Sequence, residues 1–598
     1  MTKANDHEKK EIASVAEMMF FGEINEADLL PFPHFSPEQK EMAKEMTSAV
    51  KKFGEASIDS TKLDRESKIP DEIFQELAGL GLFGLAVGEE YGGLNLDTTL
   101  YARVFQEIAG IDGSVATMLG AHQSIGYKAL LNEGTEEQKK KWLPRLASGE
   151  VVAAFCLTEP GSGSDAYSIK TKATDNKDGT YTINGQKLWI TNGGRAGFYS
   201  VFCKTEHPGK DKKTGKDIIE EKISCFIVEK DFPGISFGEK EDKMGIRASE
   251  TRAVYFDKVK VPATNMLGEP GKGFKIAMNV LNTGRLSIGS GCVGGMKSIF
   301  KIAVDHAKNR KQFGDVIANY GMIQQKLATI AAHIYACESM AYFTTGQITR
   351  GMKNYSIESA ICKIYSSEKL WECVDQCMQI AAGNGYMKEY PYERLMRDSR
   401  INMIFEGTNE ILRIYIALSG LKGPGDELKE LGRAADFSNV LHNPIKSLGV
   451  LTDYASKKIG KMVSTKTLTK VHPKLSKHAE NFSSMLHDFY LKVESTIMKL
   501  GKNIIGSELP QRRLANMAIE LYVMLAVLLR TTAILNDASV SEDDKDYVLK
   551  MTEVICRDNR QEFMRNFKRI SATYDTLIPE VSKHVCKRDG YGLDIIDF

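Results

Sequence analysis

Two kinds of hydrophobic pattern alternate along the first half of the chain. Residues 37–150 carry apolar positions at helical spacing, and Ser36-Pro-Glu-Gln supplies an N-cap, a first-turn Pro and a Gln at the third helical position. Between 151 and 270, short segments rich in β-branched and aromatic residues are separated by turn sequences, Asp175-Asn-Lys-Asp-Gly and Asn184-Gly185. Because no helical pattern intervenes, these segments predict a small antiparallel β domain and not βαβ units.

Helical spacing returns after Gly271. The long periodic runs Tyr320 to Ile348 and Ser356 to Ile380 contain few helix breakers and predict an antiparallel bundle. A further helical region follows Gly423-Pro-Gly. The sequence therefore predicts an α+β protein that is mostly α. We expect its parts to be an N-terminal extension, a helical domain, a β domain, a helical bundle and a C-terminal helical domain, at 1–36, 37–150, 151–270, 271–425 and 426–598.

The composition is typical of a soluble globular protein with several cores. The chain has 598 residues, of which 42% are hydrophobic and 26% charged. Its 79 basic and 78 acidic residues leave a net charge of +1, which gives no electrostatic footprint for nucleic acid. The ten cysteines form no Cys-x-x-Cys pair, so we expect neither a zinc site nor a disulfide scaffold, and an intracellular location is favoured.

We expect no targeting or membrane-spanning segment. The first Arg is Arg65, so residues 1–64 do not show an Arg-rich transit peptide. The most apolar stretch, Leu514 to Leu535, is interrupted by Glu520 and Arg530. These charges favour a buried core helix over a membrane span, which needs about 20 apolar residues.

Four segments carry residues suited to cofactor or substrate chemistry. The first, Cys156-Leu-Thr-Glu-Pro-Gly-Ser-Gly-Ser-Asp165, ends a predicted strand in a turn whose N–H and hydroxyl groups can bind a phosphate or a ring edge. It is not a Walker loop, because no Gly-Lys-Ser/Thr follows, and no βαβ pattern surrounds it. An ordinary tight turn is the competing interpretation.

The other three segments have equally plain alternatives. Trp189-Ile-Thr-Asn-Gly-Gly194 places a Trp at a strand end, where it can stack on an aromatic cofactor or belong to the core. Gln379-Ile-Ala-Ala-Gly-Asn-Gly-Tyr386 has glycines that admit a pyrophosphate or cap a helix. In Ile404-Phe-Glu-Gly-Thr-Asn-Glu-Ile-Leu-Arg413, apolar neighbours can raise the pKa of Glu406 into the range of a general base, although a single Glu is more simply a solvated loop residue.

Together, the four segments resemble the acyl-CoA dehydrogenase family over about residues 40–420. Cys156-Leu-Thr-Glu-x-x-Ser-Gly-Ser-Asp-x-x-Ser168 is similar to the family's first signature at every defined position. Gln379-x-x-Ala-Gly-x-Gly-Tyr, with Glu389, Arg394 and Asp398 after it, resembles the second signature, but Ala382 stands at its usual first glycine. Phe405-Glu-Gly-Thr-Asn-Glu resembles the loop of the catalytic base.

Within the family, the chain is most similar to the very-long-chain members and to their relative that assists assembly of respiratory complex I. The similarity lies in Ala153-Ala-Phe-Cys-Leu-Thr-Glu-Pro, Gly120-Ala-His-Gln-Ser-Ile-Gly126, the loop around Glu406, and the additional C-terminal domain. The resemblance implies FAD-dependent α,β-dehydrogenation of a long-chain or very-long-chain fatty acyl-CoA to a trans-2-enoyl-CoA in fatty-acid β-oxidation. The implied electron acceptor is an electron-transferring flavoprotein.

The resemblance also implies roles for individual residues. Glu406 is the implied base that removes the α-proton of the substrate. The implied FAD contacts are Phe155, Leu157, Thr158, Ser164, Trp189, Ile190, Thr191, Arg310, Phe313, Gln379, Gly383, Thr408 and Glu410. Gln379 and Gly383 would reach the FAD of a second subunit, so a homodimer is implied. The implied acyl-CoA contacts are Ser164, Glu250, Thr251, Arg252, Arg285 and Gly407.

Two further segments bear on substrate length and location. In the resembled fold, Ser114 to Tyr127 lines the acyl cavity, and its small residues Gly120, Ala121 and Gly126 leave room for a long tail or simply allow close helix packing. Residues 446–477 contain eight Lys and one Asp, and apolar residues recur in 445–477 at three- and four-residue steps. This pattern is typical of an amphipathic basic helix on an anionic membrane, or of a solvated helix face.

The implied location is the matrix face of the mitochondrial inner membrane in a eukaryote, or the cytoplasm and inner membrane of a bacterium. Two alternative functions are compatible with the same motifs. One is a complex I assembly factor that retains the dehydrogenase fold. The other is an acyl-CoA oxidase, which uses similar chemistry but reduces oxygen.

Overall fold

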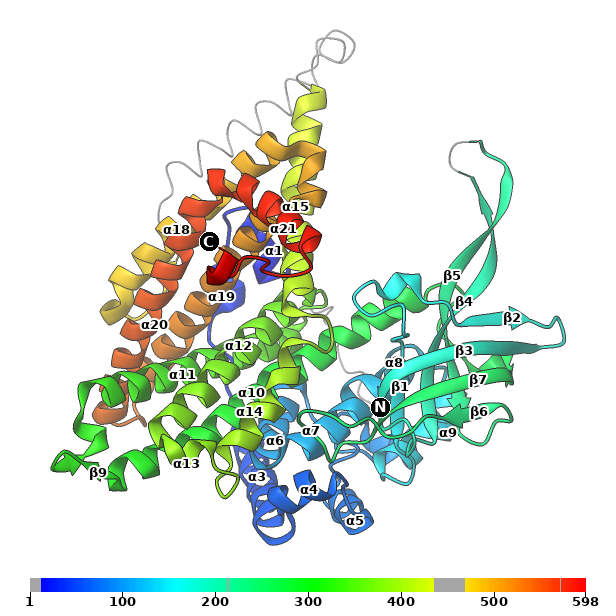
Figure 1. Ribbon diagram of the computed structural model, residues 1–598, viewed down its shortest axis with the longest axis horizontal. Coiled ribbons are helices and arrows are strands. Elements are labelled where there is room, and N and C mark those ends of the chain that lie inside the picture. Colours follow the sequence, from blue (N-terminus) through cyan, green and yellow to red (C-terminus); the bar gives the residue numbers. More distant parts are fainter. Residues whose placement is uncertain (1–11, 212–213, 435–467, 571, 598) are drawn as a thin grey trace, which may run out of the picture. The chain divides into compact units, whose positions relative to one another are not determined.

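The computed structural model (Figure 1) describes residues 12–211, 214–434, 468–570 and 572–597. The chain divides into two compact units. Unit 1 comprises Met1–Ser14 and Leu30–Leu412. Unit 2 comprises Val15–Leu29 and Arg413–Phe598. Unit 1 contains the predicted helical domain, the β domain and most of the bundle, and the candidate site residues all belong to it.

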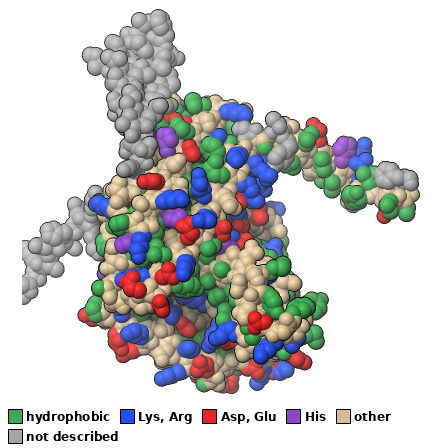
Figure 2. Space-filling model, turned by 90° about the vertical axis from the view of Figure 1, so that its left-hand side faces the viewer, with side chains coloured by type: hydrophobic (Ala, Val, Ile, Leu, Met, Phe, Trp, Pro, Cys, Tyr) green, Lys and Arg blue, Asp and Glu red, His purple; other side chains and the backbone are tan. Residues whose placement is uncertain are grey.

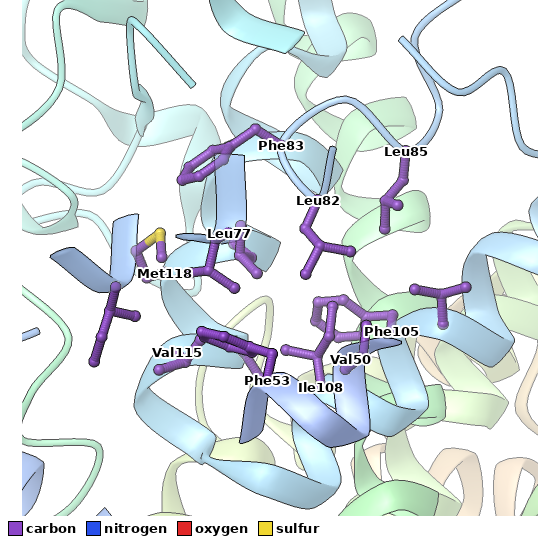
Figure 3. Packing of buried hydrophobic residues seen from close by; sticks show 14 of the residues in the cluster. Val50, Phe53, Leu77, Leu82, Phe83, Leu85, Phe105, Ile108, Val115 and Met118 are labelled. Atoms are coloured by element: carbon purple, nitrogen blue, oxygen red, sulfur yellow. The ribbon is translucent and has the colours of Figure 1, made fainter. Parts of the chain in front are cut away.

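The N-terminal part of unit 1 is helical. Its helices are α3 (Pro37–Ser57), α4 (Ser60–Glu66), α5 (Asp71–Gly79), α6 (Thr98–Ile111), α7 (Gly113–Gly120), α8 (Lys128–Glu133) and α9 (Glu136–Ala147), with the π-helical turn η2 (Ala121–Gly126) between α7 and α8. The predicted start of α3 is confirmed: Gln39 N donates to Ser36 Oγ, and Ser36 N donates to Gln39 Oε1. Figure 3 shows the core of this part, where Val50, Phe53, Leu77 and Ile108 converge from α3, α5 and α6.

The β domain is one eight-stranded sheet. Its strands are β1 (Ala153–Cys156), β2 (Lys172–Asp175), β3 (Thr180–Thr191), β4 (Phe198–Lys210), β5 (Asp217–Glu229), β6 (Ile235–Phe237), β7 (Thr251–Pro262) and β8 (Met266–Leu267). The order is β6-β7-β3-β2-β4-β5-β8, and β1 pairs with β4. Most pairs are antiparallel, as predicted, but β1 and β2 each run parallel to β4. For β2 the reason is that β3 carries the chain back before β4 begins.

One of the two predicted turns is wrong. Residues 175–179 connect β2 and β3, as expected, whereas Asn184 and Gly185 lie inside β3. Gly185 has a φ of 146°, and the pairing register with β7 shifts there. A Cβ atom on Gly185 would lie 2.5 Å from Thr171 Oγ1, so this glycine permits a close approach of two backbones and does not form a hairpin turn.

Long helices form the rest of unit 1. They are α10 (Gly273–Asn309), α11 (Gly321–Arg350) and α12 (Ser356–Ala381), followed by α13 (Gly383–Tyr386), α14 (Tyr392–Arg400) and the start of α15 (Asn409–Ala434). The runs predicted for α11 and α12 are confirmed to within two residues. A small hairpin of β9 (Lys311–Gln312) and β10 (Asp315–Val316) follows α10. Helix α10 packs against both α12 and α6, so it lies at the centre of unit 1.

Unit 2 is helical and combines α1 (Val15–Phe20) and α2 (Glu26–Leu29) with the C-terminal helices α18 (Ser476–Leu500), α19 (Glu508–Asn536), α20 (Glu542–Arg569) and α21 (Leu577–Lys587). Helix α1 packs against α18 and α19. By length and composition alone, α19 could span a membrane, but 83% of its most apolar window is buried. The prediction of a buried core helix is confirmed. Residues 445–467 of the basic segment 445–477 lie outside the described residues.

Charges of both signs are mixed on the surface. On the face drawn in Figure 2, Lys and Arg side chains are interspersed with Asp and Glu side chains. Many are paired; Lys172, for example, lies 2.6 Å from Glu206 and 3.4 Å from Glu221. This mixture is the surface expected for a chain whose net charge is +1.

Candidate active site

Glu406 lies in a tight turn immediately before α15. Glu406 and Gly407 both have positive φ, 55° and 97°, a conformation that Gly adopts freely and Glu adopts at a cost. Arg285 on α10 reaches this turn: its Nε donates to the Glu406 carbonyl oxygen at 3.2 Å, and its Nη1 donates to Asn282 Oδ1 at 3.0 Å. The predicted base and the predicted substrate contact Arg285 are therefore neighbours.

The carboxyl group of Glu406 faces α10 at Gly284. A Cβ atom on Gly284 would overlap both carboxyl oxygens, so only glycine leaves them this position. Glu406 Oε2 is buried and has no hydrogen-bond partner among the described residues. Burial raises the pKa of Glu406 to about 7, and the cations of Arg285 and Lys363 oppose that rise. A carboxylate with a raised pKa and an unpartnered oxygen is suited to accept a proton.

The two strand-end segments predicted to bind a flavin are joined by hydrogen bonds. Leu188 N donates to the Thr158 carbonyl oxygen at 2.9 Å. The Lys187 ammonium donates to the Leu157 carbonyl oxygen at 3.0 Å and to Glu159 Oε1 at 2.8 Å. Lys187 and Glu159 are both buried, and a buried ion pair holds its geometry because breaking it leaves an uncompensated charge. This pair fixes the loop 157–159 beside β3.

The residues at these strand ends fit a flavin nucleotide. The Trp189 side chain is 62% exposed, which is unusual for so large an apolar ring, and its backbone φ is 56°. Leu157 in the first segment and Ile190 in the second are buried. The Phe155 ring packs on the Phe202 ring, with ring centroids 4.9 Å apart. Ser164 is exposed, and the Cβ positions of Gly161 and Gly163 have no atom within 4 Å. An exposed ring beside accessible amides and a hydroxyl suits stacking and phosphate binding.

Strand pairing brings a third set of predicted residues to the same place. In the β3–β7 ladder, Thr191 pairs with Thr251 and Ile190 with Arg252. Glu250 Oε1 accepts a hydrogen bond from Arg252 Nε at 2.6 Å, and its carbonyl oxygen accepts one from Asn192 N at 2.8 Å. The implied substrate contacts Glu250, Thr251 and Arg252 therefore lie beside the implied flavin contacts at the end of β3.

Four predicted flavin contacts lie far from Glu406 within one chain. Arg310 follows the end of α10, and at 1.5 Å per residue it lies about 37 Å along the helix from Arg285. Gln379 lies about 24 Å beyond Lys363 on α12 by the same rise. Phe313 and Gly383 adjoin these helix ends, and the Phe313 side chain is 96% exposed. One chain does not gather these four residues with Glu406, as expected if they serve the flavin of a second subunit.

The remaining predicted contacts stand at the start of α15. Thr408 Oγ1 accepts a hydrogen bond from Ile411 N at 3.4 Å, and Glu410 is exposed in the first turn. A hydroxyl and a carboxylate are usual at a helix N-terminus, because they satisfy free N–H groups and complement the helix dipole. The flavin roles of Thr408 and Glu410 stay predictions.

The small residues near the predicted acyl cavity have packing partners. A Cβ atom on Gly126 would lie 2.6 Å from the Ala121 carbonyl oxygen and 2.9 Å from Ala153 Cβ, and one on Gly120 would lie 3.2 Å from Phe105 Cζ. Close packing therefore accounts for Gly126 without an acyl tail. Of the two interpretations of this segment, the packing one has direct support in the structure.

Three residues that shape the site were missed by sequence reasoning. They are Lys187, Gly284 and Lys363. Lys187 and Lys363 bind backbone segments that carry predicted residues, and Gly284 leaves space for the Glu406 carboxyl. A signal existed for Lys363, because it interrupts a largely apolar helical run from Ile357 to Tyr365. Gly284 also stood out as a glycine within a helix interior, where Gly costs about 1 kcal/mol relative to Ala.

The fold and this arrangement define an acyl-CoA dehydrogenase. Models of the acyl-CoA dehydrogenase N-terminal, middle and C-terminal domains match residues 36–150, 154–259 and 271–421. A fourth model, the ACAD9/ACADV C-terminal domain, matches residues 473–591.

The chain belongs to the acyl-CoA dehydrogenase family. It is 44% identical over 584 residues to the mitochondrial very long-chain specific acyl-CoA dehydrogenase of Rattus norvegicus, covering 94% of this chain and 87% of that one. Its identity to the Homo sapiens counterpart is 43% with the same coverage. The solved acyl-CoA dehydrogenase of Bacillus anthracis, complexed with FAD, has a TM-score of 0.78 and 32% identity, covering 94% of this chain and 92% of that one. The predicted family, fold class and enzyme class are confirmed.

The environment of Glu406 predicts a pH dependence. The base must be ionised to accept a proton, and its pKa is raised to about 7. We therefore expect kcat/KM for an acyl-CoA to fall about tenfold per pH unit below about 7, since this parameter reports the free enzyme. Steady-state kinetics between pH 5.5 and 9, with flavin content checked at each pH, measures this. A kcat/KM that stays constant down to pH 5.5 would contradict the assignment.

Proposed function

We propose that the protein is an FAD-dependent dehydrogenase that converts long-chain or very-long-chain fatty acyl-CoA to trans-2-enoyl-CoA in fatty-acid β-oxidation. The observation that carries the proposal is the Glu406 carboxyl group, which is buried beside Gly284 and has a raised pKa, and whose Oε2 has no hydrogen-bond partner in the part of the chain that the structure describes. The very long-chain specific relatives support the substrate class. The FAD complex of the Bacillus anthracis relative supports the cofactor.

In this mechanism Glu406 removes the α-proton of the thioester. That proton is far too weakly acidic for a free carboxylate, so donors must stabilise the negative charge that develops on the thioester oxygen. Family resemblance assigns this task in part to the backbone N–H of Glu406. Burial of the carboxyl excludes water and raises its basicity. FAD, when bound, supplies the acceptor for the β-hydrogen, which leaves as hydride.

The remaining residues bind and orient. Leu157, Thr158, Ser164 and the end of β3 at Trp189 would hold the flavin ring and its phosphates, and Glu250, Thr251 and Arg252 would contact the acyl-CoA. Arg310, Phe313, Gln379 and Gly383 would bind the FAD of the partner subunit in a homodimer. Their distance along α10 and α12 from Arg285 and Lys363, which contact the Glu406 turn, supports this division.

An electron-transferring flavoprotein is the proposed electron acceptor, and the mitochondrial matrix is the proposed location, at the inner-membrane face. The mitochondrial relatives support the compartment. An assembly role in respiratory complex I is a second candidate, because residues 473–591 match the ACAD9/ACADV C-terminal domain. Co-purification with assembly proteins of the respiratory chain would favour that role.

Exposure of the reduced enzyme to air distinguishes a dehydrogenase from an acyl-CoA oxidase. An oxidase would reoxidise its flavin rapidly in air, and a dehydrogenase would not.

The first test concerns the base. Glu406→Gln keeps the size of the side chain but cannot accept the proton, so the variant should bind FAD and acyl-CoA while its flavin fails to bleach. We expect the anaerobic bleaching rate to fall by at least about a thousandfold, the scale of losing a general base. Titrating the wild type with acyl-CoAs of graded length identifies the preferred chain. Bleaching of the variant at a near-normal rate would remove Glu406 from the mechanism.

The second test concerns the subunit boundary. Arg310→Ala removes a cation proposed to face the FAD pyrophosphate of the partner. Flavin content per chain should fall, and light scattering should detect a weakened dimer. Lys308→Ala, two residues away on the exposed end of α10, is the matched control and should retain its FAD. An Arg310→Ala protein with full FAD content and dimer mass would show that the assignment is wrong.

The third test concerns the membrane. On the basis of its sequence pattern, we propose that the segment 445–477 binds an anionic membrane surface. Each Lys near such a surface contributes on the order of 1 kcal/mol to binding, and salt screens the attraction. Changing Lys457, Lys458 and Lys461 to Glu should abolish co-flotation with anionic vesicles but preserve activity on soluble acyl-CoA. A wild-type protein that does not float with such vesicles at low salt would refute the proposal.

A further inference from the structure

A lysine without exposed surface lies under the turn that carries Glu406. Lys363 is in the middle of α12, and its side chain is 0% exposed. Its ammonium donates to the Gly407 carbonyl oxygen at 2.8 Å and to Asn409 Oδ1 at 2.7 Å. Burying a cation is costly unless its donors are satisfied, and here both acceptors belong to the segment that directly follows Glu406.

The same segment is tied to α12 at two more points. Asn409 Nδ2 donates to Ser367 Oγ at 3.1 Å and to Glu368 Oε1 at 3.0 Å. Asn409 thus accepts a hydrogen bond from Lys363 and donates to residues one turn further along the same helix. These bonds fix the position of the chain after Gly407 relative to α12.

Two cations from two helices therefore hold consecutive carbonyl groups of one turn. Arg285 on α10 binds the Glu406 carbonyl oxygen at 3.2 Å, and Lys363 on α12 binds that of Gly407. Glu406 has a φ of 55°, a strained conformation for a non-Gly residue that persists only where the surroundings impose it. Without the Lys363 bond, the turn can relax, and a change in this backbone moves the carboxyl away from Gly284.

We propose that Lys363 is a positioning residue for the base: by binding the Gly407 carbonyl, it keeps the Glu406 carboxyl aimed at the α-carbon of the substrate. This inference rests on the proposed role of Glu406. Lys363 touches neither substrate nor reacting atoms and acts through the turn. A misplacement of about 1 Å costs on the order of a hundredfold in rate, which sets the size of the expected effect.

The titratable groups around Lys363 belong to three elements. Glu406 lies in the turn, Arg285 and Cys292 on α10, and Glu368 on α12 itself. Burial lowers the pKa of Lys363 to about 7, against the attraction of the Glu406 carboxylate. The two acceptor oxygens at hydrogen-bond distance favour the charged form. Replacing Lys363 therefore removes both a donor to the turn and a cation near the base, and the experiment must separate these effects from simple loss of folding.

The test uses the full-length enzyme with FAD. Lys363→Met removes the donors and keeps the length of the side chain, whereas Lys363→Arg keeps donors and charge. Lys369→Met is the matched control, because Lys369 is on the same helix and pairs with Glu372 at 2.8 Å. Asn409→Ser is a milder second variant, which removes one of the two acceptors of Lys363 together with the hydrogen bonds from Asn409 to Ser367 and Glu368.

We expect anaerobic flavin bleaching at saturating acyl-CoA to slow about a hundredfold in Lys363→Met, while FAD content and the Kd for acyl-CoA stay within about threefold of wild type. An acyl-CoA deuterated at the α-carbon should show a larger isotope effect in this variant, because proton removal has become slower. Lys363→Arg should recover most of the rate, Asn409→Ser should lose about tenfold, and Lys369→Met should match wild type.

Two results would overturn the inference. One is a Lys363→Met bleaching rate within twofold of wild type. The other is a rate loss that merely parallels the loss of FAD or of acyl-CoA binding, which is the behaviour of a residue needed only for folding. If Lys363→Met does not fold, the same two criteria are applied to Asn409→Ser. Failure of the proposed function gives a different result from failure of this inference, because the flavin of the Glu406→Gln variant would then still bleach with acyl-CoA.

Discussion

The site depends on the hydrogen bonds that two buried cations donate to one backbone turn. Arg285 and Lys363 bind adjacent carbonyl oxygens at Glu406 and Gly407, and the turn they hold has two residues with positive φ. Neither cation can act unless α10 and α12 lie side by side, which the central packing of α10 provides. Gly284 completes the arrangement, because it is the position on α10 that leaves space for the carboxyl. The long helices therefore determine where the base stands.

The same physical device recurs at the other side of the site. Lys187 on β3 binds the Leu157 carbonyl oxygen and Glu159, and so holds the loop that would contact the flavin. In both places a buried ammonium binds a backbone carbonyl next to a residue proposed to function, at 2.8 Å for Gly407 and 3.0 Å for Leu157. Buried cations of this kind preserve geometry because their loss leaves unsatisfied polar groups in the interior.

Much of the fold could be predicted from the sequence. The capping box at Ser36 and the periodic runs of α11 and α12 could be predicted because they depend only on residues close together in the sequence. The Asn184-Gly185 turn prediction was wrong because Gly185 serves a close contact with the backbone of Thr171. Thr171 lies fourteen residues away, so the sequence around Gly185 gives no sign of this contact. The parallel pairing of β1 and β2 with β4 was equally hidden, since strand order depends on non-local hydrogen bonds.

The sequence by itself determined the chemistry that is present: a Glu between Phe405 and Gly407, a Trp before two glycines, and the segment order that identifies the family. Only the tertiary structure decided which of these residues meet. It placed Arg285 and Lys363 on the base turn, paired Thr191 with Thr251, and separated Arg310 and Gln379 from Glu406 by the length of their helices. The reason is that pKa values and positions of buried groups depend on neighbours distant in sequence, which become neighbours only when helices and strands pack.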